Sequence, residues 1–137
     1  MADLTKSLNI ASAGMRVQGV RLRVLSENIA NAQSVGEKPG EDPYRRKVVV
    51  FDNELDRKLG VDTVNVKKIT EDKSDFILKY DPSHPAADKE GYVKMPNINP
   101  LIEMMDMREA QRSYEANLNV IEASRDMLDK TINLLRN

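Results

Sequence analysis

Three groups of residues have types and spacings that could support chemistry, and the first is the single histidine. His84 stands between Ser83 and Pro85, two residues after Pro82. A histidine that acts as a general base needs an orienting carboxylate and a substrate pocket. Two prolines so close to it are typical of a rigid, exposed turn. The sequence therefore favours a structural or surface role for His84.

The second group is the glycine pair Gly14 and Gly19, whose spacing matches the start of a phosphate-binding loop. Such a loop follows a strand and continues with lysine and then serine or threonine. Here Val20 and Arg21 follow, and the surrounding pattern is helical. Glycine inside a helix costs about 1 kcal/mol relative to alanine. We therefore expect these glycines to allow close helix–helix approach or local pliability.

The third group consists of charged clusters. The basic run 45–47 could contact phosphates, but acidic residues at 41–42 dilute it, and a solvated strand face is the simpler interpretation. Glu103 and Asp106 could share a cation, yet carboxylates three residues apart on a helix more often form a solvated face. We therefore predict no catalytic residues, no metal site and no cofactor.

The composition agrees with that expectation. The 137 residues include no cysteine, one histidine, 21 basic and 22 acidic side chains, and the net charge is −1. Without cysteine, disulfides, thiolate metal sites and cysteine nucleophiles are excluded. The balanced charge gives no reason to expect nucleic acid or an anionic membrane as a partner. The start lacks a basic segment followed by an apolar run, so we expect no cleaved signal peptide.

The elements that must position these residues begin with a long helix in residues 1–32. Apolar residues follow a heptad pattern from Leu4 to Ala32, and Gln18 fills the one polar step. This pattern is typical of a helix that packs along another helix. We expect Asp3 to be the N-cap and Gly36 to follow the helix as a stop signal.

A second heptad stripe runs from Met104 to Leu135, with Gln111 and Arg125 as its polar members. Asn99 followed by Pro100 favours a helix start there, so we predict a helix from Pro100 to Arg136. Residues 1–32 have four basic and two acidic side chains, whereas residues 101–137 have five basic and seven acidic ones. Complementary stripes and charges predict that the two helices pair as a coiled-coil-like hairpin.

The segment between the helices, residues 33–100, has a different composition. Glycine, proline and charged residues in 33–43 indicate a loop. Runs of β-branched and aromatic residues predict strands in 44–51, 61–69, 76–80 and 92–95, with turns at 59–60, 72–74, 81–85 and 90–91. The predicted fold class is therefore α+β, with long terminal helices and a small, extended β-rich segment between them.

The two helices carry more apolar surface than one partner can cover. Val17 and Val24 on the first helix, and Met105 and Val120 on the second, lie beside the stripes. A lone helix pair of this length leaves most of that surface wet and is marginal by itself. We therefore expect the chain to become fully ordered against other subunits, as an assembly protein does.

Four motifs along the chain resemble those of the rod proteins of the bacterial flagellar basal body, within the flagellar axial protein family. The resemblance covers essentially the full length. One departure is Gln33–Ser34, where the wider axial family usually has asparagine and threonine. The matching segments are Leu25–Ala32 (LSENIANA), Pro43–Phe51 (PYRRKVVVF), Tyr80–Asn99 (YDPSHPAADKEGYVKMPNIN) and Met104–Asn117 (MMDMREAQRSYEAN).

The resemblance implies a non-enzymatic structural subunit of the proximal rod, which transmits torque across the periplasm and forms part of the export channel wall. It implies export by the flagellar type III apparatus without signal cleavage, and terminal helices that form the inner layer of the rod with residues 33–100 outside them. The implied partners are FlgB, FlgF, FlgG, FliE, the MS ring and other copies of this chain.

We predict that residues of both stripes, with two asparagines of the first motif, pack against other subunits. They are Leu4, Leu8, Ala11, Met15, Leu22, Leu25, Asn28, Ile29, Asn31, Met104, Met107, Tyr114, Leu118, Ile121, Leu128, Ile132 and Leu135.

Three other classes of function compete with this interpretation. A cytosolic adaptor or secretion chaperone would form a soluble stoichiometric complex instead of a polymer. An enzyme would need a deep polar pocket with perturbed titrating groups. A surface-bound amphipathic helix protein would need polar faces rich in lysine and arginine, and the acidic second helix argues against it.

Overall fold

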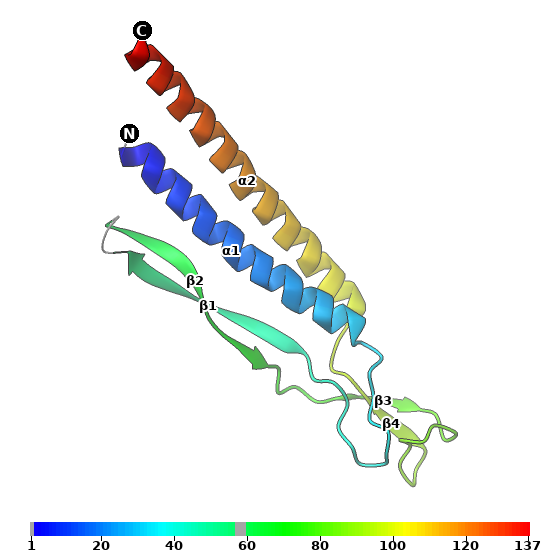
Figure 1. Cartoon of the computed structure of the whole chain (residues 1–137). Coiled ribbons are helices and arrows are strands. Elements are labelled where there is room, and N and C mark those ends of the chain that lie inside the picture. The colour runs from blue at the N-terminus through cyan, green and yellow to red at the C-terminus, as the bar shows by residue number, and fades with distance from the viewer. Residues whose placement is uncertain (1, 57–59) are drawn as a thin grey trace.

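The computed structural model describes residues 2–56 and 60–137, which form an elongated molecule (Figure 1). Helix α1 (Ala2–Ala30) lies between helix α2 (Pro100–Arg136) on one side and the hairpin of strands β1 (Lys47–Asp56) and β2 (Val61–Glu71) on the other. A second hairpin, strands β3 (Ile77–Tyr80) and β4 (Tyr92–Met95), lies where α1 ends and α2 begins. The predicted α+β class with paired terminal helices is confirmed.

The C-terminal helix follows its local signals closely. The side chain of Asn99 accepts a hydrogen bond from the amide of Leu101 at 3.1 Å, and Pro100 occupies the first turn. An asparagine cap followed by proline suits a helix start because neither position needs an intrahelical N–H bond. Both predicted ends, Pro100 and Arg136, are confirmed.

The N-terminal helix differs from the prediction at both ends. Asp3 lies inside the first helical turn, so the prediction that it caps the helix was wrong. Its negative charge there still interacts favourably with the positive end of the helix dipole. The helix ends at Ala30, two residues before Ala32. Gly36 belongs to the following loop, where a Cβ would stand 2.9 Å from the carbonyl oxygen of Glu41. Gly36 therefore permits a close return of the loop.

The strands form two separate two-stranded antiparallel sheets. β1 pairs with β2 from Lys47 opposite Glu71 to Asp56 opposite Val61, with an irregularity between Val50 and Phe51. β1 begins at residue 47 and not at 44. The amide of Tyr44 donates to the carbonyl of Ser34, and the amide of Arg46 donates to Oδ1 of Asn97, so neither amide pairs with β2. Of the predicted turn at 59–60, residue 59 lies outside the described residues.

The core lies along α1, on two of its sides. The buried residues Ala13 and Val17 lie beside β2, and the buried residues Val24 and Leu25 line the space that α1 shares with β1 and α2. α2 packs only on α1 among the described elements. Neither described helix is long and apolar enough to cross a membrane.

Candidate assembly surfaces

A buried polar junction fixes how the helices and the β1–β2 hairpin meet. Asn28, which is fully buried, projects from the last turns of α1 toward the start of β1. Its Nδ2 donates to the carbonyl of Lys47 at 2.9 Å, and its Oδ1 accepts from the amide of Lys47 at 2.9 Å. Nδ2 also lies 3.2 Å from Oε2 of Glu103. The side-chain amide of Asn28 thus pairs with both backbone hydrogen-bonding groups of Lys47, as a neighbouring strand would.

Arg46 connects this junction to the loop after β2. Its guanidinium donates through Nε to Oε1 of Glu103, whose side chain is 1% exposed, and through an Nη to Oδ2 of Asp72 at 3.2 Å. Burial is the largest influence on Arg46 and lowers its pKa, but the bonds and charges of both carboxylates outweigh it and raise the pKa. The pKa of Asp72 is lowered, chiefly by hydrogen bonds from Ser74 and further by Arg46. The carboxylates therefore hold a partly buried cation in one position.

Asn97 completes the junction from the segment before α2. Its Oδ1 accepts from the amide of Arg46 at 2.8 Å, and its Nδ2 donates to the carbonyl of Asp72 at 3.0 Å. The guanidinium of Arg45 donates to the carbonyls of Asp72 and Ser74 and stacks on Phe76, 4.1 Å from the ring centroid. The basic run 45–47 is therefore engaged in packing. The interpretation of this run as a solvated strand face was wrong.

The seam between α1 and α2 depends on small side chains. A Cβ on Gly14 would stand 2.8 Å from Nδ2 of Asn117, so the expectation of close helix approach is confirmed at Gly14. A Cβ on Gly19 would meet nothing within 4 Å, so no close approach explains that glycine. Ala110 and Ser124 are buried on the α2 side of the seam. The seam thus uses positions that a search for large apolar residues passes over.

The predicted stripe of α2 and the observed seam coincide only in part. Half of its eight apolar members are partly buried, on the side where α2 packs on α1: Met107, Tyr114, Ile121 and Leu128. Between them, the seam uses positions one residue earlier than the stripe, such as Ala110 in place of Gln111 and Ser124 in place of Arg125. The remaining apolar members lie beside the seam and are exposed, namely Met104, Leu118, Ile132 and Leu135. We call these four residues the α2 flank.

The predicted packing residues of α1 lie closer to the interior. Ala11, Leu25 and Asn28 are buried. Asn31 follows the helix and makes local bonds, donating to the carbonyl of Glu27 at 2.8 Å and accepting from the hydroxyl of Ser34. The other predicted members are partly buried, namely Leu4, Leu8, Met15, Leu22 and Ile29. The structure of one chain therefore leaves more of the predicted surface free on α2 than on α1.

The residues first considered for chemistry make structural hydrogen bonds. Nδ1 of His84 accepts from the amide of Ala86 at 3.0 Å within a turn. Glu103 lies in the polar junction and does not share a site with Asp106. In residues 2–56 and 60–137, no three acidic or histidine side chains form a group that could hold a metal ion.

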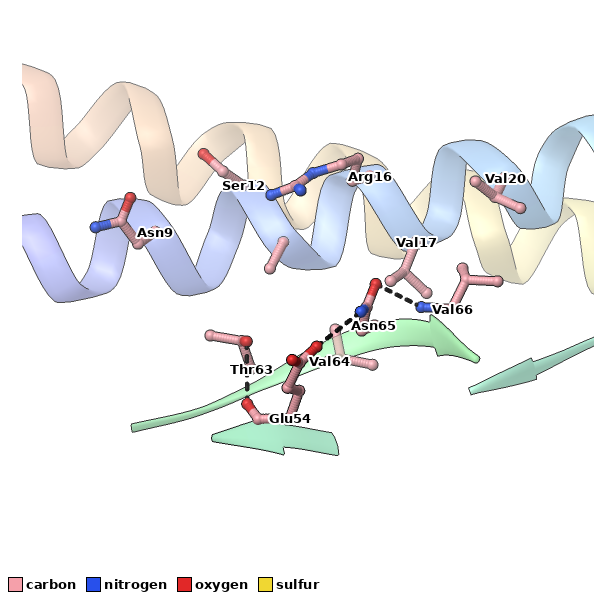
Figure 2. Close-up of a pocket in the computed structure, with 11 residues that line it drawn as sticks. Asn9, Ser12, Arg16, Val17, Val20, Glu54, Thr63, Val64, Asn65 and Val66 are labelled. Atoms are coloured by element: carbon pink, nitrogen blue, oxygen red, sulfur yellow. Dashed lines mark hydrogen bonds between the residues drawn. The ribbon is translucent and has the colours of Figure 1, made fainter. Parts of the chain in front are cut away.

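A groove of about 450 Å³ runs between α1 and β2 (Figure 2). Val17, Val20 and Val66 contribute apolar side chains, and Arg16 lies at the α1 rim. On the strand side, Nδ2 of Asn65 donates to Oε2 of Glu54 at 3.0 Å. The groove therefore has an apolar wall, a cation, Arg16, that forms no ion pair with the described residues, and an acidic group, Glu54, that is already hydrogen-bonded.

An elongated helix pair whose longer helix leaves an apolar flank uncovered is typical of structural proteins that assemble with other chains. The family described as flagellar basal body rod FlgEFG protein C-terminal matches residues 89–134. The flagellar basal-body rod protein FlgC of Agrobacterium fabrum is 57% identical over 136 residues, which cover 99% of this chain and 98% of that protein. The FlgC proteins of Borreliella burgdorferi and Bacillus subtilis are 40% identical over 151 residues and 41% over 143, covering 97% and 93% of this chain and 98% and 95% of their own lengths. The chain belongs to the FlgC family of flagellar basal-body rod proteins.

Proposed function

We propose that this chain is a structural subunit of the proximal rod and polymerises through α1 and α2. In this role it forms part of the drive shaft and of the export channel wall, without catalytic activity. Family membership supports a place in the basal body. The observation that carries the proposal is the α2 flank, where apolar side chains of a heptad stripe stay exposed, Leu135 by 78%.

The fold suits the transmission of torque. Twisting or shearing the helix pair breaks close contacts such as that between Gly14 and Asn117, because dense packing resists deformation. The polar junction ties the β1–β2 hairpin to both helices through Asn28, Arg46 and Glu103. A load on the hairpin is therefore passed to the helices through hydrogen bonds and an ion pair.

Family membership supports the arrangement that we propose within the rod. The terminal helices, residues 1–32 and 101–137, form the inner layer, and residues 33–100 lie outside and contact neighbouring subunits. Partners are copies of this chain and the rod proteins FlgB, FlgF and FlgG, with FliE and the MS ring at the base. The chain reaches this place in the periplasm through the flagellar export apparatus, without signal cleavage.

The test replaces one residue of the α2 flank. Ile132→Asp puts a charge on that flank, whereas the control Asn133→Asp adds the same charge at an exposed position beside it. We expect mass spectrometry of detergent-extracted basal bodies to detect the wild type and the control at a fixed ratio to other rod proteins. The Ile132→Asp chain should be synthesised in the cell but absent from the basal bodies. Recovery of the wild type only in a soluble cytoplasmic complex would instead support the adaptor class.

A further inference from the structure

The two helices carry opposite charges that one chain does not neutralise. A single ion pair joins α1 and α2 in the described structure, between Arg21 and Glu109 at 3.5 Å. Arg16 and Arg23 are exposed on α1 and form no ion pair with any described residue. Glu115 and Glu122 are likewise exposed and unpaired on α2 within the described residues. Two positive charges on α1 and two negative charges on α2 are thus left for another molecule.

These charges occur in two complementary rows. Arg16, Val20 and Arg23 are four and three residues apart, so they share one face of α1. On α2, Glu115, Leu118 and Glu122 are three and four residues apart and share one face in the same way. Each row spans about 10 Å, because seven helical residues rise 1.5 Å each. Each row also has an apolar residue between its two charges.

The row on α1 borders the groove beside β2. Figure 2 shows Arg16 and Val20 on α1 at this groove, with Val17 directed toward β2. The space of about 450 Å³ leaves room for side chains of a second helix. On the other row, Leu118 is 37% exposed and lies on the flank of α2 that α1 leaves uncovered. One row offers a cationic groove, and the other an acidic ridge with an apolar centre.

We propose that α2 of a second copy of this chain packs antiparallel on this row of α1. In this register Arg16 meets Glu122, Val20 meets Leu118, and Arg23 meets Glu115. The inference rests on the proposed function and specifies which helix faces meet during assembly. Opposite charges at both ends of the contact favour this register over a shifted one. The direction follows from the spacing, because the steps of four and three residues on α1 match those on α2 only when the helices run antiparallel.

The same contact cannot form within one chain. The intrachain seam places Gly14 beside Asn117 and Asn28 beside Glu103, whereas the proposed contact is shifted by about seven residues, or about 10 Å. Because the contact joins different faces of the two copies, the first copy keeps its α2 row free and the second copy keeps its α1 row free. Such a contact can continue from copy to copy, as a helical tube requires.

Charge reversal tests the contact in cells whose only copy of the chain is the variant. We expect Arg16→Glu with Arg23→Glu, and separately Glu115→Arg with Glu122→Arg, to lower the amount of the chain in purified basal bodies at least about 10-fold. A chain that carries all four changes should recover to within about twofold of wild type, because the pairs are restored with reversed sign. The control, Lys67→Glu with Lys68→Glu, makes the same charge change on exposed β2 residues outside the groove and should assemble normally.

Cysteine cross-linking gives a second, independent measurement. The chain has no native cysteine, so Val20→Cys with Leu118→Cys introduces the only two thiols. A disulfide needs Cα atoms within about 7 Å, so oxidation should link Val20 of one copy to Leu118 of another in basal bodies.

Two results would overturn the contact. One is normal assembly of the charge-reversed pairs, and the other is failure of the four-change chain to recover when its helical content and unfolding midpoint match wild type. Either result would leave the proposed function standing if Ile132→Asp still prevents incorporation.

Discussion

The two helices have similar patterns but different surroundings. α1 is covered on two sides: Val17 lies beside β2, and Val24 and Leu25 line the space that α1 shares with β1 and α2. α2 is covered on one side only, and its buried residues are Glu103, Ala110 and Ser124, none of them a large apolar side chain. Burial of apolar surface stabilises a fold roughly in proportion to the area removed from water. The stability of the single chain is therefore concentrated on α1 and the polar junction, and the apolar surface of α2 remains for other molecules.

Breaking the polar junction should have the largest effect on the isolated chain. Asn28→Asp places a carboxylate where Nδ2 lies 3.2 Å from Glu103, and it removes the donor to the carbonyl of Lys47. We expect the free energy of unfolding to fall by about 3 kcal/mol or more, because a buried charge is left unpaired. Urea unfolding of the purified chain measures this. Asn31→Asp, after the end of α1, should cost less than about 1 kcal/mol, and an equal loss would contradict a special role for Asn28.

Replacing one valine by alanine on each helix tests the difference between the helices directly. Val24 is 2% exposed on α1, and Val120 is 44% exposed on α2. We expect Val24→Ala to lower the free energy of unfolding by about 1–2.5 kcal/mol through lost burial and a residual cavity. Val120→Ala should change it by less than about 0.5 kcal/mol. Similar losses in denaturant unfolding would show that α2 supports the chain as much as α1 does.

The two glycines of α1 sharpen the comparison at the seam. Gly19→Ala should raise the free energy of unfolding by about 0.5–1 kcal/mol, because nothing lies within 4 Å of the new Cβ and alanine favours helix. Gly14→Ala should lower it, because its Cβ would meet the Asn117 side chain at 2.8 Å. Thermal and urea unfolding of the two variants measure the sign. A stabilised Gly14→Ala chain would mean that α2 can shift away at little cost.

The smallest expected effect is on how the free energy of unfolding changes at acid pH. The pKa of Asp72 is lower in the folded chain than in an unfolded one, first because of Ser74 and then because of Arg46. Its contribution to stability is therefore present above the unfolded pKa of about 4 and is lost as the pH falls through the lower, folded value. We expect Asp72→Asn to flatten the decline of stability below about pH 4. The control Asp75→Asn removes a carboxylate from the same loop and leaves the contacts of Asp72 with Ser74 and Arg46 in place.

Local signals account for most of the elements. The cap Asn99–Pro100 located the start of α2, and β-branched runs located β1 to β4 within a few residues, since propensity, capping and turn chemistry act between near neighbours. The polar junction was not predicted. Asn28 stood in a motif and Glu103 in an acidic pair, and a polar residue in a heptad-rich helix was the one available signal. Their hydrogen bond joins positions 75 residues apart, which no local pattern encodes.

The α2 stripe shows what the order of residues determines and what only tertiary packing decides. Periodicity alone established that α2 is a helix with one apolar side, and motif similarity established its family, since both are properties of residue order. Which neighbouring row faces α1 depends on how closely the backbones approach. With Gly14 against Asn117, small residues such as Ala110 and Ser124 take the buried positions at the centre of the seam, and Leu118 and Ile132 turn outward. Side-chain volume at the contact therefore selected the buried row, and that choice left the larger side chains for a partner.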